Sequence, residues 1–212
     1  MIKLNPESVN SESIGSGLFC CFQLRWQRDN YMPTFLGHAV SGLAVNALTQ
    51  NKSYSVRNAV ICAVCAVAPD LDAIGFRLGI PYGHWLGHRG FTHSVLFAVL
   101  LALLFSLFTK KEPSTKIRLL LAASFFLSVL LHDVLDAMTN GGLGVAFFSP
   151  FSNTRYFLPW HAIEVSPISP ARFFSLRGLT VLKSEFLWVM APSFVVMILS
   201  RFIQHSRMKS TS

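Results

Sequence analysis

The segment from Ile117 to Met138 reads IRLLLAASFFLSVLLHDVLDAM, an apolar run of helical length that ends in ionisable residues. On a helix, residues four apart share one face, so His132 and Asp136 project together. An imidazole and a carboxylate on one face are a common ligand pair for a divalent metal. Because uncompensated ionisable groups in a membrane helix cost several kcal/mol, this stretch predicts a polar site at the end of a membrane span.

The composition is that of an integral membrane protein. Charged residues make up 13% of the 212 residues and hydrophobic residues 52%, and the mean hydropathy is +0.48. Ordinary soluble domains carry roughly 25% charged residues. The net charge of +8 is explained by cytoplasmic loops rich in Lys and Arg. No basic patch interleaved with exposed aromatic residues stands out, so we do not expect nucleic-acid binding.

Five apolar segments after Met32 predict an all-α fold, a polytopic membrane helical bundle of about five helices. The expected helices cover residues 35–48, 56–68, 92–108, 117–138 and 185–203. We expect Pro69 to stop the second helix, Thr92 to cap the third and Pro192 to kink the last. Several segments are shorter than the roughly 20 residues of a full span, so a half-buried or interfacial placement stays open for the first two.

The chain divides into three regions by composition. Residues 1–31 are polar, rich in Ser and Asn and without periodicity, which predicts a disordered extension or a start-site artefact with Met32 as the natural start. Residues 32–205 form the membrane-embedded domain, and residues 206–212 form a basic tail. Within the domain, 144–183 is rich in aromatic residues and proline, which predicts an irregular interfacial segment over the helix ends.

Three further stretches carry the same ligand types at the ends of other apolar segments: Gly37-His38, Pro69-Asp70-Leu71-Asp72 and His88-Arg89-Gly90-Phe91-Thr92-His93. In an up-and-down bundle these stretches and His132/Asp136 fall on the same side, because they lie alternately at helix starts and helix ends. A set of His and carboxylate ligands without thiolate suits Zn, Mn or Fe, with one or two ions. Capping aspartates, buried hydrogen-bonded histidines and an Arg89–Asp70 ion pair are the structural alternatives.

Charge predicts which side of the membrane the site faces. The short connections and the tail opposite the site carry nine Lys and Arg residues, and the longer loops on the site side carry six from Met32 onward. The nine are Lys52, Arg57, Lys110, Lys111, Lys116, Arg118, Arg201, Arg207 and Lys209. Because positive charges in short loops stay in the cytoplasm, the site is expected on the outer face.

The simplest chemistry for such a site is metal-assisted attack of water on a phosphoester or similar bond. Arg89 is then a candidate to stabilise phosphoryl charge, although a lipid-headgroup contact or an ion pair explains this arginine equally well.

Several strings resemble a known family: Met32-Pro33-Thr34 with Gly37-His38, Ala68-Pro69-Asp70-Leu71-Asp72, and Gly87-His88-Arg89-Gly90-Phe91-Thr92-His93-Ser94. They continue with His132–Asp136, Thr139, Gly141-Gly142 and Ser149-Pro150-Phe151-Ser152. Together they resemble the bacterial family of predicted inner-membrane metal-dependent hydrolases typified by YdjM. Arg155-Tyr156-Phe157 and Pro159-Trp160 resemble its YbcI-like branch, and the likeness covers residues 32–203.

The resemblance, with a more distant one to zinc phospholipase C and P1-type nucleases, implies the metal-ligand positions. They are His38, Asp72 (or Asp70), His88 or His93, His132 and Asp136. Asp70 and Arg89 are the candidates for catalysis. Those soluble enzymes use further ligands, for which only His161 and Glu164 are available here, three apart instead of four. One or two ions are therefore expected in place of three.

The leading hypothesis is a membrane-bound metal-dependent hydrolase in the bacterial inner (plasma) membrane, in contact with the lipid bilayer. Its expected substrate is a phosphoester in a lipid or an envelope-related compound. The alternative is a non-catalytic metal- or partner-binding membrane protein. A transporter is a weaker hypothesis, because the polar residues gather at one end of the bundle.

Overall fold

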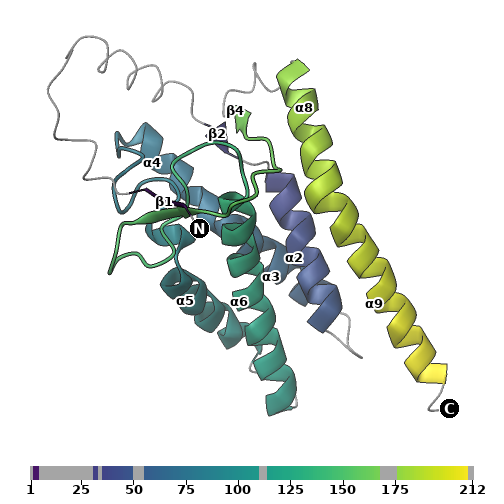
Figure 1. The fold of residues 1–212 in the computed structure, drawn as a ribbon. Helices are drawn as coiled ribbons and strands as arrows, with labels where there is room; N and C mark the ends of the chain where they lie inside the picture. Colours follow the sequence, from purple (N-terminus) through teal and green to yellow (C-terminus); the bar gives the residue numbers. More distant parts are fainter. Residues whose placement is uncertain are drawn as a thin grey trace, which may run out of the picture.

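The computed structural model describes residues 2–4, 31–32, 35–49, 55–109, 114–167 and 176–209. The described chain is mainly helical (Figure 1). Its principal helices are α2 (Phe35–Thr49), α3 (Val56–Val67), α5 (Val95–Ser106), α6 (Thr115–Ala137), α8 (Leu176–Glu185) and α9 (Ala191–Lys209).

Three helical stretches are long and apolar enough to cross a membrane. They are Val56–Arg77, Thr115–Ala137 and Gly178–Ser206, and α2 and α5 are shorter apolar helices. Large apolar side chains such as Leu103, Leu119 and Phe202 are exposed on these helices, as expected for surfaces that face lipid. The predicted all-α membrane bundle is confirmed.

Inside the bundle, small side chains allow the helices to approach closely. A Cβ atom on Gly42 of α2 would lie 2.5 Å from the carbonyl oxygen of Cys62 on α3. Cys62 and Cys65 are buried free thiols in a core cluster that includes Phe125 and Val129 of α6. Close packing of small residues is a common way for membrane helices to associate.

The second α-helix, α3, ends at Val67, directly before Ala68-Pro69, as expected from the proline. The chain then continues through a 3₁₀ turn, η2 (Ala68–Ala73), into the short helix α4 (Ile74–Arg77). Pro69 lies in the first turn of η2, where its missing N–H breaks no hydrogen bond and its fixed φ suits the turn. As a result, Asp70 is held inside the bundle and is 1% exposed.

The third helix also begins differently from the expectation. Residues Phe91–His93 form a 3₁₀ turn, η3, and Ser94 is the N-cap residue of α5. The Ser94 hydroxyl accepts a hydrogen bond of 3.1 Å from the backbone N–H of Phe97. Thr92, the expected cap, instead donates its hydroxyl hydrogen to Asp72.

The last helix begins at Leu176, not near Glu185, so residues 176–183 do not belong to the irregular segment. Between α8 and α9 the chain forms a π-helical turn, η5 (Phe186–Met190). Pro192 is the second residue of α9 and has no N–H to donate to the preceding turn, which the wider π turn accommodates. Where the sequence predicted a kink at Pro192, the structure has a π turn directly before α9.

Residues 138–167 pass over the end of α6 (Figure 1). Leu158 N–H donates to the carbonyl of Ala137, and Ile163 N–H to that of Met138. Two short antiparallel pairs join this segment to earlier residues: β3 (Arg155–Phe157) with β1 (Ile2–Leu4), and β4 (Ser166–Pro167) with β2 (Tyr31–Met32). The rest of the expected extension, 5–30, and the tail residues 210–212 lie outside the described residues.

Candidate metal centre

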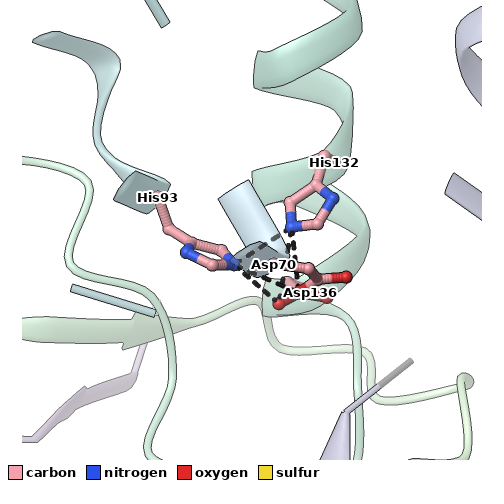
Figure 2. Close-up of side chains that lie close together, drawn as sticks. All are labelled: Asp70, His93, His132 and Asp136. Atoms are coloured by element: carbon pink, nitrogen blue, oxygen red, sulfur yellow. Dashed lines mark hydrogen bonds and ion pairs between the residues drawn. The ribbon is translucent and has the colours of Figure 1, made fainter. Parts of the chain in front are cut away.

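Four side chains from three elements converge at one end of the bundle: Asp70 of η2, His93 of η3, and His132 and Asp136 of α6. One ligand atom from each lies within 4.8 Å of the others, and all four side chains are buried (Figure 2). The sequence expectation that dispersed polar stretches meet at one end of the bundle is confirmed by this geometry. We call these residues the four-ligand group.

The two histidines of this group face each other through their Nε2 atoms, which are 3.0 Å apart. Asp136 Oδ2 lies 3.4 Å from His93 Nε2 and 3.9 Å from His132 Nε2. Asp70 Oδ1 lies 3.7 Å from each of the same nitrogens. The arrangement thus directs two imidazole nitrogens and two carboxylate oxygens at a common point.

The outer nitrogens of both rings are engaged as donors. His132 Nδ1 lies 2.7 Å from the carbonyl oxygen of Ala66, which can only accept a hydrogen bond. His93 Nδ1 lies 3.2 Å from Asp72 Oδ2, a carboxylate oxygen. In the neutral rings both Nε2 atoms therefore carry lone pairs, which repel at 3.0 Å unless a cation lies between them. Two nitrogens bound to one metal ion at about 2.1 Å are roughly 3.4 Å apart at a tetrahedral angle and roughly 3.0 Å apart at a right angle, so the spacing is close to that of a shared metal.

The two carboxylates of the group are only partly compensated, since one guanidinium, that of Arg89, lies 2.8 Å from Asp136 Oδ2. Among the described residues, neither oxygen of Asp70 or of Asp136 receives a hydrogen bond of normal geometry, although all four atoms are buried. A buried carboxylate without compensation is costly, and proteins pair it with a cation or a metal. The donor set therefore fits a divalent metal ion.

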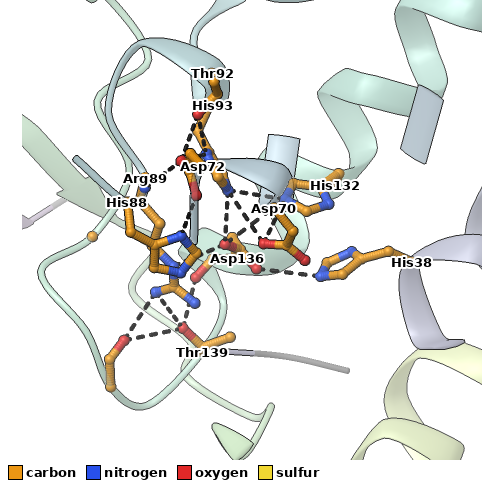
Figure 3. A network of polar contacts seen from close by, with 12 residues as sticks. His38, Asp70, Asp72, His88, Arg89, Thr92, His93, His132, Asp136 and Thr139 are labelled. Atoms are coloured by element: carbon orange, nitrogen blue, oxygen red, sulfur yellow. Dashed lines mark hydrogen bonds and ion pairs between the residues drawn. The ribbon is translucent and has the colours of Figure 1, made fainter. Parts of the chain in front are cut away.

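Asp72 belongs to a second group, with His88 and His93, whose ligand atoms are also within 4.8 Å of one another. Its Oδ1 lies 2.6 Å from His88 Nδ1, while its Oδ2 accepts hydrogen bonds from Thr92 Oγ1 (2.5 Å) and Arg89 N (3.2 Å) (Figure 3). A carboxylate so fully occupied by donors fixes the orientation of the adjacent histidines, as the outer partners of metal ligands do. The geometry thus places Asp70 in the four-ligand group and Asp72 next to that group, in contact with His88 and His93. The sequence alone did not decide which of the two aspartates is the ligand.

The carboxylates around His93 also favour a positive charge on its ring. Burial by itself would lower the pKa of His93, but the carboxylates of Asp72, Asp136 and Asp70 outweigh it and raise the pKa well above its ordinary value. A proton or a metal ion at Nε2 satisfies the same carboxylates, so the two compete for this position.

Arg89 is fully buried and touches the four-ligand group directly. Its Nε lies 2.8 Å from Asp136 Oδ2, and its Nη1 donates to Thr139 Oγ1 and to the carbonyl of Gly141, both at 3.0 Å. Its φ is +60°, a strained left-handed conformation of the kind found at functional sites. Its Nη2 has no hydrogen-bond partner among the residues described. The Nη2 hydrogens of Arg89 are therefore available as hydrogen-bond donors beside the four-ligand group.

His38 approaches the group from α2. Its Nε2 lies 3.4 Å from Asp136 Oδ1, and its ring stacks on that of His132 with centroids 3.9 Å apart. His161 is exposed and packs on Phe157, so it joins neither group. Glu164 likewise belongs to neither group.

The structure adds buried residues that the sequence reasoning did not select. Both oxygens of Asp133 are buried without a hydrogen bond from the described part of the chain, and Glu185 is buried close to Gly37. Arg155 fixes the loop before Arg89, since it donates to the carbonyls of His88 and Tyr82, both at 2.9 Å. Asp133 was within reach of sequence reasoning because it adjoins His132, whereas Glu185 arrives from a distant segment without a motif. Arg155 belongs to the string that resembles the YbcI-like branch, but the sequence assigned it no role at the site.

Residues 32–208 match the sequence profile of the family described as YdjM inner membrane protein. The chain belongs to the YdjM family. Inner membrane protein YbcI of Escherichia coli (strain K12) is 35% identical to this YdjM-family chain over 168 residues, which cover 78% of the chain and 95% of YbcI. No solved structure matches the chain significantly. The resemblance predicted from the sequence is confirmed, and membership supports an inner-membrane location for the three candidate spans.

Proposed function

We propose that this YdjM-family protein is a membrane-bound metal-dependent hydrolase with its ion in the four-ligand group. The observation that carries the proposal is the pair of facing Nε2 atoms of His93 and His132, 3.0 Å apart, whose outer nitrogens are both committed as donors. A bound Zn, Mn or Fe ion would supply Lewis acidity and lower the pKa of a coordinated water.

The chain itself prepares the ligands. Asp72 holds the proton on Nδ1 of His93, and the carbonyl of Ala66 holds the proton on Nδ1 of His132. Each interaction leaves Nε2 unprotonated and fixes the ring, as outer hydrogen-bond partners of metal ligands commonly do. Asp70 and Asp136 supply the negative charge that favours a divalent cation over a neutral ligand.

Arg89 suits a phosphoryl group. In a guanidinium the Nη2 and Nε hydrogens form one fork, and here Nε faces Asp136 while Nη2 has no partner among the described residues. Burial would lower the pKa of Arg89, but the carboxylate of Asp136 outweighs this effect and raises the pKa, so the side chain stays cationic. A buried cation with free donors beside a metal is suited to stabilise the negative charge of a phosphoester during hydrolysis.

The substrate class follows from location. The four-ligand group lies at one end of a bundle with three candidate spans, and a site at the end of such spans would face the headgroup region of the bilayer. We therefore propose a phosphoester of a lipid or envelope-related compound. The excess of Lys and Arg in the opposite connections, such as Lys116 and Arg118, supports an outer-face position of the site.

The test is hydrolysis by the full chain purified in detergent and loaded with Zn²⁺, with phosphomonoester and phosphodiester substrates that include phospholipids. Arg89→Lys should lower kcat/KM by about 10²–10³-fold, because a lysine cannot keep both the Asp136 contact and the Nη2 donors. Arg118→Lys, at the far end of α6, is the matched control. No turnover by a metal-loaded wild type, or equal rates for the two variants, would contradict the proposal.

A structural metal in a non-catalytic membrane protein is the alternative function. It is favoured by one observation, the complete burial of all four ligands, because structural metal sites are typically closed whereas catalytic sites keep an open position. A tightly bound ion whose removal lowers the Tm, combined with no turnover of any phosphoester tried, would select this alternative.

A further inference from the structure

We propose that the site holds a second cation, on the side of Asp70 and Asp136 that faces His38, so that the two carboxylates bridge two ions. The inference rests on the proposed ion in the four-ligand group and adds a separate position next to it. Its ligands would be the outward oxygens of the two aspartates together with His38.

The two oxygens of Asp136 face different histidines. Oδ2 lies 3.4 Å from His93 Nε2 and 3.9 Å from His132 Nε2, on the side of the first ion. Oδ1 lies 3.4 Å from His38 Nε2. This separation equals the distance between Asp136 Oδ2 and His93 Nε2 inside the four-ligand group. A carboxylate that offers one oxygen to each of two histidine sets is arranged as a bridge.

Asp70 is divided in the same way. Its Oδ1 lies 3.7 Å from both His93 Nε2 and His132 Nε2, and its Oδ2 is buried without a hydrogen bond from any described residue. Figure 3 shows His38 reaching from α2 toward the carboxylates of Asp70 and Asp136. Asp136 therefore has one oxygen beside His38, and Asp70 has one buried oxygen without a hydrogen bond on the part of the carboxylate that the first ion does not use.

His38 itself needs a partner of this kind. The residue is 2% exposed, and neither ring nitrogen makes a hydrogen bond within the part of the chain that the structure describes. The approach of Nε2 to Asp136 Oδ1 at 3.4 Å is too long for a good hydrogen bond, so the buried imidazole loses its interactions with water without full compensation. Coordination of a cation through Nε2 would compensate that loss.

Negative charge on this side extends beyond the two aspartates. A Cβ atom on Gly37 would lie 3.5 Å from Glu185 Oε2, so this buried carboxylate reaches the backbone next to His38. Together, the bridging oxygens, the unpartnered imidazole and the adjacent carboxylate favour a second divalent cation. In hydrolases that use two metals, ions about 3.5–4 Å apart stabilise both the attacking and the leaving oxygen, so the proposal gives His38 a role in the same reaction.

The test is manganese binding to the full chain in detergent, followed by elemental analysis and electron paramagnetic resonance. Wild type should bind about two Mn²⁺ per chain and give the spectrum of an exchange-coupled pair, as expected for carboxylate-bridged ions. His38→Ala should bind about one Mn²⁺ with a single-ion spectrum, and His161→Ala, which removes an exposed histidine, should match wild type. One uncoupled ion, or none, in wild type would overturn the proposal, as would a coupled pair in His38→Ala.

This experiment separates the second ion from the hydrolase itself. An active wild type with one uncoupled ion would refute the second position alone, whereas a coupled pair without turnover would refute the hydrolase alone. If His38→Ala does not fold, His38→Gln replaces it, and the wild-type spectrum decides whether the pair exists.

Discussion

Replacement of Asp72 by asparagine tests how the metal ligands are held without removing any member of the four-ligand group. Asp72 Oδ1 faces His88 Nδ1 at 2.6 Å, while Oδ2 accepts from Thr92 Oγ1 and Arg89 N and lies 3.2 Å from His93 Nδ1. An asparagine has one carbonyl oxygen and one amide group. Whichever way it turns, N–H hydrogens will oppose either the donors around Oδ2 or His88 Nδ1.

The magnitude follows from the role of His93. Without a carboxylate at Nδ1, the ring loses both its fixed orientation and the preference for a proton on Nδ1, so Nε2 is a poorer ligand. Loss of such an outer partner typically weakens metal affinity by about 10–100-fold, which is about 1.4–2.7 kcal/mol.

The assay is competition for Zn²⁺ between the detergent-purified protein and a chromophoric chelator, with Kd measured for wild type and Asp72→Asn. Glu164→Gln is the matched control, because Glu164 is a half-buried carboxylate outside both groups. We expect the control to keep the wild-type Kd. An Asp72→Asn protein that folds normally and binds Zn²⁺ as tightly as the control would refute the reasoning.

Two further predictions concern the fold. Gly42→Ala should lower the free energy of unfolding by about 1–3 kcal/mol, because its Cβ would lie 2.5 Å from the Cys62 carbonyl oxygen and 2.8 Å from Ala66 Cβ. Gly83→Ala, whose Cβ would meet no atom within 4 Å, is the control, and equal melting temperatures of the two variants would contradict the packing described. Burial raises the pKa of Tyr82, so the folded protein favours the neutral phenol. The contribution of the neutral Tyr82 phenol to folding stability is fully present below its ordinary pKa of about 10, and it is lost as the pH rises above that value. Tyr82→Phe should therefore show a smaller fall in Tm between about pH 9 and 11 than wild type, and parallel curves would count against this effect.

The apolar pattern of the chain and the four-residue spacing between His132 and Asp136 were enough to predict a membrane bundle with a polar centre at one end. Local periodicity determines which face of α6 carries these two ligands, and the alternation of helices brings the other stretches to the same end. Both properties depend on residues close together in the sequence, so they can be recognised without a structure.

The choice between Asp70 and Asp72 depends on a feature that periodicity does not reveal. Pro69 starts a 3₁₀ turn, and this turn directs Asp70 into the bundle and Asp72 toward His88. Likewise, the turn at Phe91–His93 moves the helix cap from Thr92 to Ser94 and releases the Thr92 hydroxyl for Asp72.

Residues that reach the site from other segments were beyond sequence reasoning. Glu185 lies at the end of α8, and its approach to Gly37 requires the packing of that helix region against α2. Arg155 acts through the carbonyls of a loop more than 60 residues earlier in the chain. Glu185 belongs to no motif, and the Arg155-Tyr156-Phe157 string carries no spacing that points to the site, so only the tertiary structure connects the two residues to the centre.

The four-ligand group is expected to bind a divalent metal ion. The most direct measurement is elemental analysis of the detergent-purified full chain, compared with His132→Ala and with the exposed-site control His161→Ala. We predict a transition metal bound in at least equimolar amount in wild type and in the control, and its loss from His132→Ala. No bound metal in wild type, or the same metal content in all three proteins, would contradict the account.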